Sequence, residues 1–304
     1  MAAQTDAQDS STRLDTVPAR VGVLGGGRMG GGIAHAFLLA GAAVTVVERD
    51  DAAASAARER IERSIDASIA RGFAGDARAL RAALTVATNS AAFAGTELVV
   101  EAVPESLELK LSALSGIEAQ VDPTAVIASN TSSIPLSQLS SALADPARFI
   151  GLHFFNPVPA SSLIEVVVCD TTDEALPERA RSWVRALGKT PITVADAPGF
   201  ASSRLGVALA LEAIRMVEQG VASAADIDLA MELGYRHPTG PLRTTDIVGL
   251  DVRLGIAEQL ERDLGPNFTP PQLLRDMVAA GKLGRKTGAG FYDWPDTPSE
   301  RSTP

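Results

Sequence analysis

A glycine-rich loop near the N-terminus constrains the fold of this chain more than any other feature. Gly25, Gly27 and Gly30 form a GxGxxG pattern between the apolar run 20–24 and a helical pattern that continues to residue 40. In a strand–turn–helix unit the first glycine permits the turn, the second lets the backbone approach a pyrophosphate, and the third allows close helix packing. The pyrophosphate lies at the helix N-terminus. The pattern predicts a dinucleotide-binding loop, with Arg28 and Met29 between its last two glycines.

Strand-like apolar runs alternate with helical patterns up to residue 196. The runs are 20–24, 43–47, 84–87, 98–101, 125–129, 149–153, 163–168 and 191–194. Periodic helical segments alone follow, at 202–219, 224–233, 244–264 and 271–280. Alternation of this kind is typical of a doubly wound sheet. We predict an α/β fold with a Rossmann-type, doubly wound, mostly parallel sheet, followed by an all-helical C-terminal domain.

The length of 304 residues favours two domains. We expect a disordered polar tail over 1–17, a dinucleotide-binding domain over 18–196, a helical substrate and dimerisation domain over 197–294, and a flexible tail over 295–304. Within the first domain, segment 50–84 has the pattern of two charged helices broken near Gly72. It is longer than one crossover needs, so we expect this helical excursion to have an additional role.

The net charge and the composition exclude some classes of binding partner. The formal net charge of −10 argues against nucleic acid, and no apolar run approaches the ~20 residues that span a bilayer. The one cysteine, Cys169, lies in an apolar run and has no partner for an internal disulfide, which is typical of a reducing compartment. Segment 1–17 lacks the features of a signal or transit peptide. We expect a cytoplasmic protein without a nucleic-acid, membrane or metal partner.

An acidic residue ends the second predicted strand. Glu48 lies 18 positions after Gly30, near the spacing at which a carboxylate binds the adenosine ribose and repels a 2′-phosphate. This arrangement favours NAD over NADP. Arg49 leaves an alternative open, because an arginine at this turn can hold a 2′-phosphate, although a solvated surface arginine fits equally well.

A histidine and a carboxylate occupy two successive predicted strands. His153 ends one strand, and Glu165 follows 12 residues later in the next. If the strands are neighbours, Glu165 can hold one ring nitrogen while the other accepts a proton from a substrate alcohol. A structural salt bridge is the alternative for an isolated pair. The polar run 129–133 follows another strand and either donates hydrogen bonds to a substrate oxygen or nicotinamide, or caps the next helix.

Six sequence blocks then occur in a fixed order: GGGRMG, VVEAVPE, ASNTSS, GLHFFNPVP, DAPGF and GRKTGAGFYDW. In this order they resemble the short-chain L-3-hydroxyacyl-CoA dehydrogenase family, which includes bacterial 3-hydroxybutyryl-CoA dehydrogenases. The resemblance runs from about Arg20 to Trp294. It implies an oxidoreductase of fatty acid metabolism that interconverts (S)-3-hydroxyacyl-CoA, such as 3-hydroxybutyryl-CoA, and 3-oxoacyl-CoA by hydride transfer with NAD.

The same resemblance implies roles for individual residues. His153 becomes the general base, Glu165 its partner, and Ser132 a hydrogen-bond donor to the C3 oxygen of the substrate. The implied NAD contacts are Gly25 to Gly30, Glu48, Glu105, Lys110, Ser132, Asn156 and Lys286. Ser64 and Arg71 in the helical excursion match positions that contact coenzyme A, and a solvated helix face is the alternative for both.

Ser203 departs from the family pattern. The family usually has an asparagine four residues after the glycine of its Pro-Gly-Phe motif, where that side chain bonds substrate. Ser203 is shorter and would reach the substrate through water. We therefore include Ser203 among the predicted catalytic-site residues, with its effect on chain-length preference open.

The helical domain has an apolar periodicity over 205–217 and 221–233 that exceeds the needs of one short bundle. A homodimer, as in the family, explains it, and burial within the monomer is the alternative.

Other functions remain open. The same machinery could act on a non-CoA 3-hydroxy acid such as carnitine or a sugar acid, whose free carboxylate would require a cationic partner in the pocket. A non-catalytic crystallin-like relative would not need His153 and Glu165. A 6-phosphogluconate-like dehydrogenase requires a catalytic lysine near the domain junction, whereas the nearest lysine, Lys189, precedes the last predicted strand.

Overall fold

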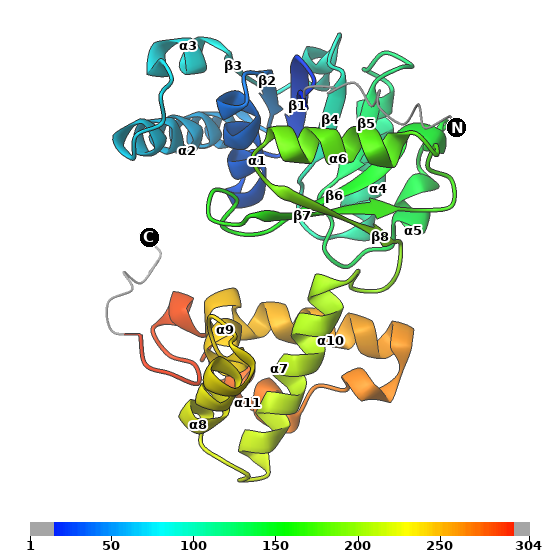
Figure 1. Ribbon diagram of the computed structural model, residues 1–304. Coiled ribbons are helices and arrows are strands. Elements are labelled where there is room, and N and C mark those ends of the chain that lie inside the picture. The colour runs from blue at the N-terminus through cyan, green and yellow to red at the C-terminus, as the bar shows by residue number, and fades with distance from the viewer. Residues whose placement is uncertain (1–14, 295–304) are drawn as a thin grey trace, which may run out of the picture. The chain divides into compact units, whose positions relative to one another are not determined.

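The computed structural model describes residues 15–294 (Figure 1). Residues 1–14 of the expected N-terminal tail and the whole expected tail 295–304 lie outside the described residues. The chain forms two compact units. One comprises the residues up to Thr131 together with Leu136–Ala195, and the other comprises Ser132–Pro135 and the residues from Asp196 onward. Among residues 15–294, every helix is too short or too polar to span a bilayer.

An eight-stranded sheet forms the centre of the first unit. Its strands are β1 (Arg20–Leu24), β2 (Ala43–Val47), β3 (Leu84–Ala87), β4 (Leu98–Glu101), β5 (Val126–Ser129), β6 (Phe149–Phe154), β7 (Leu163–Val168) and β8 (Thr190–Ala195). They lie in the order β3-β2-β1-β4-β5-β6-β7-β8, and only the β6–β7 pair is antiparallel. The first six strands follow the Rossmann order 3-2-1-4-5-6. The predicted doubly wound, mostly parallel sheet is confirmed.

Helices cover both faces of this sheet (Figure 1). They are α1 (Arg28–Leu39), α2 (Asp51–Ala70), α3 (Ala77–Ala82), α4 (Leu107–Glu118), α5 (Leu136–Ser140) and α6 (Leu176–Ala186). The carboxylate of Asp50 starts α2, because it accepts a hydrogen bond of 2.7 Å from the backbone N–H of Ala53. Helices α2 and α3 make up the predicted helical excursion, which returns to the sheet at edge strand β3.

Alternation along β6 and β7 decides where the predicted catalytic pair points. Ile150, Leu152 and Phe154 lie in the apolar core that also contains residues of α1 and α6. Ile164 and Val166 of β7 enter the same core. Because side chains alternate along a strand, His153 and Glu165 both point to the opposite face of the sheet.

The second unit is helical, with α7 (Ser202–Glu218), α8 (Ala224–Leu229), a π-helical turn (Ala230–Gly234), α9 (Pro241–Val248), α10 (Leu250–Leu264) and α11 (Gln272–Ala279). Its core includes Val207, Leu211, Leu250 and Leu260.

The prediction of one helix over 244–264 was wrong. Gly249 has a φ of +108°, which interrupts the helical path and separates α9 from α10.

The GRKTGAGFYDW block docks onto α9 through one carboxylate. Asp246 is fully buried and accepts hydrogen bonds of 2.9 Å from the backbone N–H groups of Phe291 and Tyr292. It also accepts a bond of 2.9 Å from the indole N–H of Trp294. A Cβ atom at Gly290 would overlap the Asp246 carboxylate, so glycine is needed there. This part of the family resemblance thus has a structural explanation within the helical unit.

Candidate active site

The glycine loop has the geometry of a pyrophosphate cradle. Gly25 has a φ of +91°, and a Cβ atom on Gly30 would overlap the Gly25 carbonyl. Gly27 caps the N-terminus of α1, where no side chain bonds the free amides. A Cβ atom on Gly27 would meet nothing within 4 Å, so the backbone there is open to approach. The loop therefore fits the pyrophosphate of NAD.

Two charged side chains, one just after β2 and one on α2, hold this loop. Glu48 Oε1 accepts a hydrogen bond of 2.6 Å from the Gly26 N–H. Arg60 of α2 donates to the Gly26 carbonyl at 2.6 Å. The Arg49 guanidinium instead pairs with Asp50 at 3.0 Å and is 83% exposed. Sequence reasoning missed Arg60, since it is one of many arginines on a charged helix.

A buried ion pair lies behind the predicted cofactor contacts. Lys110 Nζ donates to both oxygens of Glu101, at 2.8 and 3.0 Å, and both side chains are almost fully buried. Ser129 donates to Glu101 Oε2 at 2.6 Å. Lys110 also lies 3.3 Å from Glu105 Oε2. The sequence analysis did not single out Glu101, although an acidic residue that ends an apolar strand in the VVEAVPE block is a usable signal.

The loop after β5 is joined to its neighbours by side chains. Asn130 Oδ1 accepts a hydrogen bond of 2.8 Å from the Phe154 N–H at the end of β6. Thr131 donates to Glu105 Oε1 at 2.7 Å. The ASNTSS, HFFNP and VPE blocks therefore meet at one edge of the sheet. This is the carboxyl-end edge of β4, β5 and β6, where doubly wound sheets bind ligands.

His153 and Glu165 are directly opposed on the antiparallel pair β6–β7. His153 Nδ1 lies 2.7 Å from Glu165 Oε2, and the glutamate is fully buried. Phe155 packs against the imidazole with ring centroids 4.5 Å apart. When Nδ1 carries the proton and donates to Glu165, Nε2 is left with a lone pair that can accept a proton.

The other predicted residues are distributed over both units. Ser64 donates within α2 to the Arg60 carbonyl at 2.9 Å, and Arg71 is an exposed residue at the end of that helix. Asn156 is exposed just after β6. Ser132, Ser203 and Lys286 belong to the helical unit, where Lys286 Nζ pairs with Asp251 at 2.6 Å.

Lys189 has a structural task in the first unit. Its ammonium group donates to the backbone carbonyls of Val158 and Ser161, and burial lowers its pKa. The group therefore stabilises the loop between β6 and β7.

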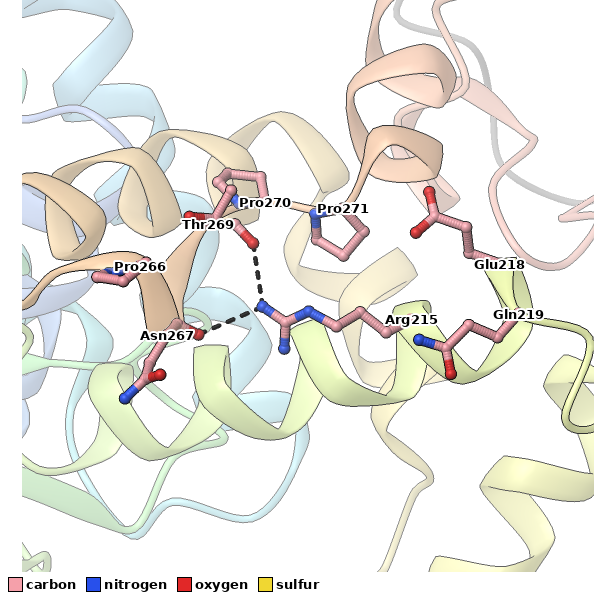
Figure 2. Close-up of a pocket in the computed structure, with 8 residues that line it drawn as sticks. All are labelled: Arg215, Glu218, Gln219, Pro266, Asn267, Thr269, Pro270 and Pro271. Carbon is pink, nitrogen blue, oxygen red and sulfur yellow. Dashed lines mark hydrogen bonds between the residues drawn. The ribbon is translucent and has the colours of Figure 1, made fainter.

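A separate hollow of about 370 Å³ lies in the helical unit (Figure 2). Arg215 reaches across it and donates to the carbonyls of Asn267 and Thr269 at 3.3 and 3.0 Å. None of the predicted site residues lines this hollow. Within residues 15–294, no group of three or more His, Cys, Asp or Glu side chains is arranged to hold a metal ion.

A Rossmann-order sheet, an open glycine loop and a carboxylate-bound histidine at the end of a strand define an NAD-dependent dehydrogenase. Two family models match this chain: the NAD-binding domain of 3-hydroxyacyl-CoA dehydrogenase over residues 20–197, and its C-terminal domain over 199–294. The chain belongs to the 3-hydroxyacyl-CoA dehydrogenase family.

Individual relatives agree with this assignment. The chain is 43% identical to a 3-hydroxybutyryl-CoA dehydrogenase of Mycobacterium tuberculosis over 280 residues, which cover 90% of this chain and 98% of the relative. The crystal structure of (S)-3-hydroxybutyryl-CoA dehydrogenase PaaH1 from Ralstonia eutropha matches with a TM-score of 0.87 and 37% identity, over 92% of this chain and 100% of that one. A diketoreductase that catalyses reactions of dicarbonyl compounds matches with a TM-score of 0.81 and 29% identity, over 91% and 99% of the two chains.

Proposed function

We propose that this enzyme interconverts (S)-3-hydroxybutyryl-CoA and acetoacetyl-CoA, with His153 as the general base. The observation that carries the proposal is the 2.7 Å contact between His153 Nδ1 and the fully buried Glu165 carboxylate. The short-chain substrate is the one named for the relatives in Mycobacterium and Ralstonia.

In the oxidative direction His153 Nε2 accepts the proton of the 3-hydroxyl group. Glu165 is a positioning residue, because it fixes the imidazole tautomer and stabilises the imidazolium that forms. Ser132 donates a hydrogen bond to the C3 oxygen, and Ser203 contacts the substrate through water. Bound NAD would supply the acceptor for the hydride that leaves C3.

We propose that the glycine loop, Glu48, Glu105, Asn156 and Lys286 contact NAD. Lys110 is almost fully buried by its pairing with Glu101, so its proposed contribution is to position Glu105. Preference for NAD over NADP is supported by the Glu48 carboxylate beside the loop and by the pairing of Arg49 with Asp50. Ser64 and Arg71 remain the proposed coenzyme A contacts.

We also propose a cytoplasmic homodimer that functions in fatty acid metabolism. The helical unit exposes many large apolar side chains, which are Leu205, Val221, Leu229, Leu233, Tyr235, Ile247, Val248 and Val252. Such a surface favours association through this unit. Sedimentation equilibrium should give twice the chain mass, and a monomer at micromolar concentration would contradict the dimer.

The function is tested by following NADH oxidation with acetoacetyl-CoA and the purified full-length chain. Parallel reactions contain NADPH in place of NADH, or free acetoacetate in place of the thioester. We expect turnover with acetoacetyl-CoA and NADH, with a lower kcat/KM for NADPH. Absence of thioester turnover, together with activity on the free acid, would replace the proposal by a non-CoA 3-hydroxy acid dehydrogenase.

A further inference from the structure

An arginine occupies the apolar stripe of α10. The buried residues of this helix are Leu250, Arg253, Ala257 and Leu260, at the three- and four-residue spacing of a core-facing stripe. Leu250, Ala257 and Leu260 belong to the core of the helical unit. Arg253 is 8% exposed, so its charged group lies where the pattern calls for an apolar side chain.

Within the described part of the chain, Arg253 has no acidic partner, and one of its buried nitrogen atoms is unsatisfied. Its Nε atom has no hydrogen-bond partner among residues 15–294. Burial lowers the pKa of Arg253 to about 10, and no neighbouring acidic group opposes that shift. The side chain still carries its charge at neutral pH. A buried charge without an oppositely charged partner destabilises the fold, so the position requires a reason other than stability.

Among residues 15–294, the other buried charged side chains have an oppositely charged or hydrogen-bonding partner, although Arg148 Nε, like Arg253 Nε, has no hydrogen-bond partner of its own. Lys110 donates to both oxygens of Glu101, and Asp246 accepts three N–H groups. Arg148 is bonded to Glu118 at 3.0 Å.

Small residues on α7 face this guanidinium. A Cβ atom at Gly206 would lie 3.2 Å from Arg253 Nη1, so even an alanine there would crowd the charged group. Ser203 lies three residues before Gly206, which places both on one face of α7 within a helical turn. Both are half-buried. The absence of a side chain at Gly206 therefore accommodates the guanidinium on the face of α7 that also carries Ser203.

We propose that Arg253 binds a carboxylate of the substrate, so that the enzyme accepts carboxylate-bearing 3-oxo substrates in addition to uncharged acyl chains. This inference rests on the proposed function, in which Ser203 contacts the substrate. The carboxylate has two chemical sources: C1 of a free 3-oxo acid, or the far end of an acyl chain that is bound as its CoA thioester. Either would form a charge-assisted, bidentate pair with the guanidinium.

The test compares substrates that differ only in this charge. NADH-dependent reduction of 3-oxohexanoyl-CoA and of its ω-carboxylate counterpart 3-oxoadipyl-CoA is measured for the wild type and Arg253→Met, with acetoacetyl-CoA and free acetoacetate as the second pair. For one of the two carboxylates, we expect Arg253→Met to lower kcat/KM roughly 10- to 100-fold more than for its uncharged partner, the size of a lost charge-assisted hydrogen bond. Which pair responds identifies the source of the carboxylate.

Control variants separate this effect from a loss of structure. Arg262→Met removes an exposed arginine from the same helix. It should leave the ratio of kcat/KM between charged and uncharged substrate unchanged in both substrate pairs. Arg253→Met should also raise the melting temperature, because it removes an unpaired buried charge. If Arg253→Met does not fold, Gly206→Ala provides the second test. Its Cβ atom would crowd Arg253 Nη1 and should lower kcat/KM for the carboxylate substrate relative to its uncharged partner.

The outcomes are distinct for the two proposals. If the wild type does not reduce acetoacetyl-CoA, the proposed function fails. If it does, and Arg253→Met affects charged and uncharged substrates equally, only the role of Arg253 fails. A change of oligomeric mass in Arg253→Met without a change of substrate ratio would likewise overturn the inference and assign the arginine to a subunit interface.

Discussion

Replacing Glu165 by glutamine tests the proposed base with the least change in shape. The substitution retains the length of the side chain and removes the negative charge that His153 Nδ1 contacts at 2.7 Å. Glu165 is fully buried and directly opposed to His153 in the β6–β7 register, so water cannot replace the lost carboxylate. The imidazole retains its position but loses the group that stabilises its charged form.

Two effects set the magnitude. Loss of a hydrogen bond between charged groups is worth about 1.5–3 kcal/mol, or roughly 10- to 100-fold in rate. The glutamine amide can also donate its own N–H to Nδ1, which leaves the ring proton on Nε2, where it blocks proton acceptance. With both effects, kcat should fall by about 10²- to 10⁴-fold, the usual range for a general base.

The assay is oxidation of (S)-3-hydroxybutyryl-CoA, with NADH binding followed by fluorescence as a check on the fold. His153→Gln should cause a loss of similar size, and the double variant should be no slower than His153→Gln, because the two side chains act as one unit. Glu178→Gln, on the exposed face of α6, is the matched control. Glu165→Gln with more than about a third of the wild-type kcat, or additive losses in the double variant, would refute the reasoning.

Three further predictions concern the cofactor loop, the C-terminal block and a buried histidine. Glu48→Ser should raise the NADPH-to-NADH ratio of kcat/KM by roughly 10-fold, since the carboxylate beside Gly26 no longer repels a 2′-phosphate; an unchanged ratio would remove Glu48 from cofactor selection. Asp246→Ala leaves three donors unsatisfied and should lower the free energy of unfolding by about 3–5 kcal/mol in urea titrations, whereas a loss below about 1 kcal/mol would contradict its role in docking the block. Burial, and then the charge of Arg71, lower the pKa of His35 in the folded state. Below about pH 6.5 the histidine is therefore protonated in the unfolded chain but remains neutral in the folded protein. The free energy of unfolding should decline as the pH falls, by up to about 1.4 kcal/mol per pH unit. His35→Gln should reduce the loss of stability between pH 7.5 and 5.5, and an equal loss in the variant would show that another group is responsible.

Local sequence patterns predicted most of the helices and strands, because each pattern reflects the conformational preference of a few neighbouring residues. Period-two apolar runs gave strands close to the observed bounds, and the glycine loop marked the first turn correctly. Helix 244–264 was predicted as one element, because a single glycine within a periodic pattern is compatible with a continuous helix. In the structure Gly249 has a positive φ, and a Cβ atom there would come within 2.9 Å of the Asp251 carboxylate, so the break in the helix suits glycine.

In the candidate site, too, some features could be predicted from local patterns and others required the tertiary structure. His153 and Glu165 could be proposed from strand ends and spacing, but only the antiparallel β6–β7 register brings the two side chains to 2.7 Å. Glu101 was not singled out, since a carboxylate at a strand end acquires meaning only when Lys110 and Ser129 are known to meet it.

Arg253 shows most clearly what local sequence patterns cannot predict. The dinucleotide-binding sheet and the helical unit could be predicted from the sequence, because apolar periodicity and glycine geometry act over a few neighbouring residues. An arginine in the pattern of α10 is indistinguishable from a solvated surface residue when only that helix is considered. Only the folded structure reveals that Arg253 is buried against Gly206 of α7, because burial and the absence of a charge partner depend on segments separated by more than forty residues of chain.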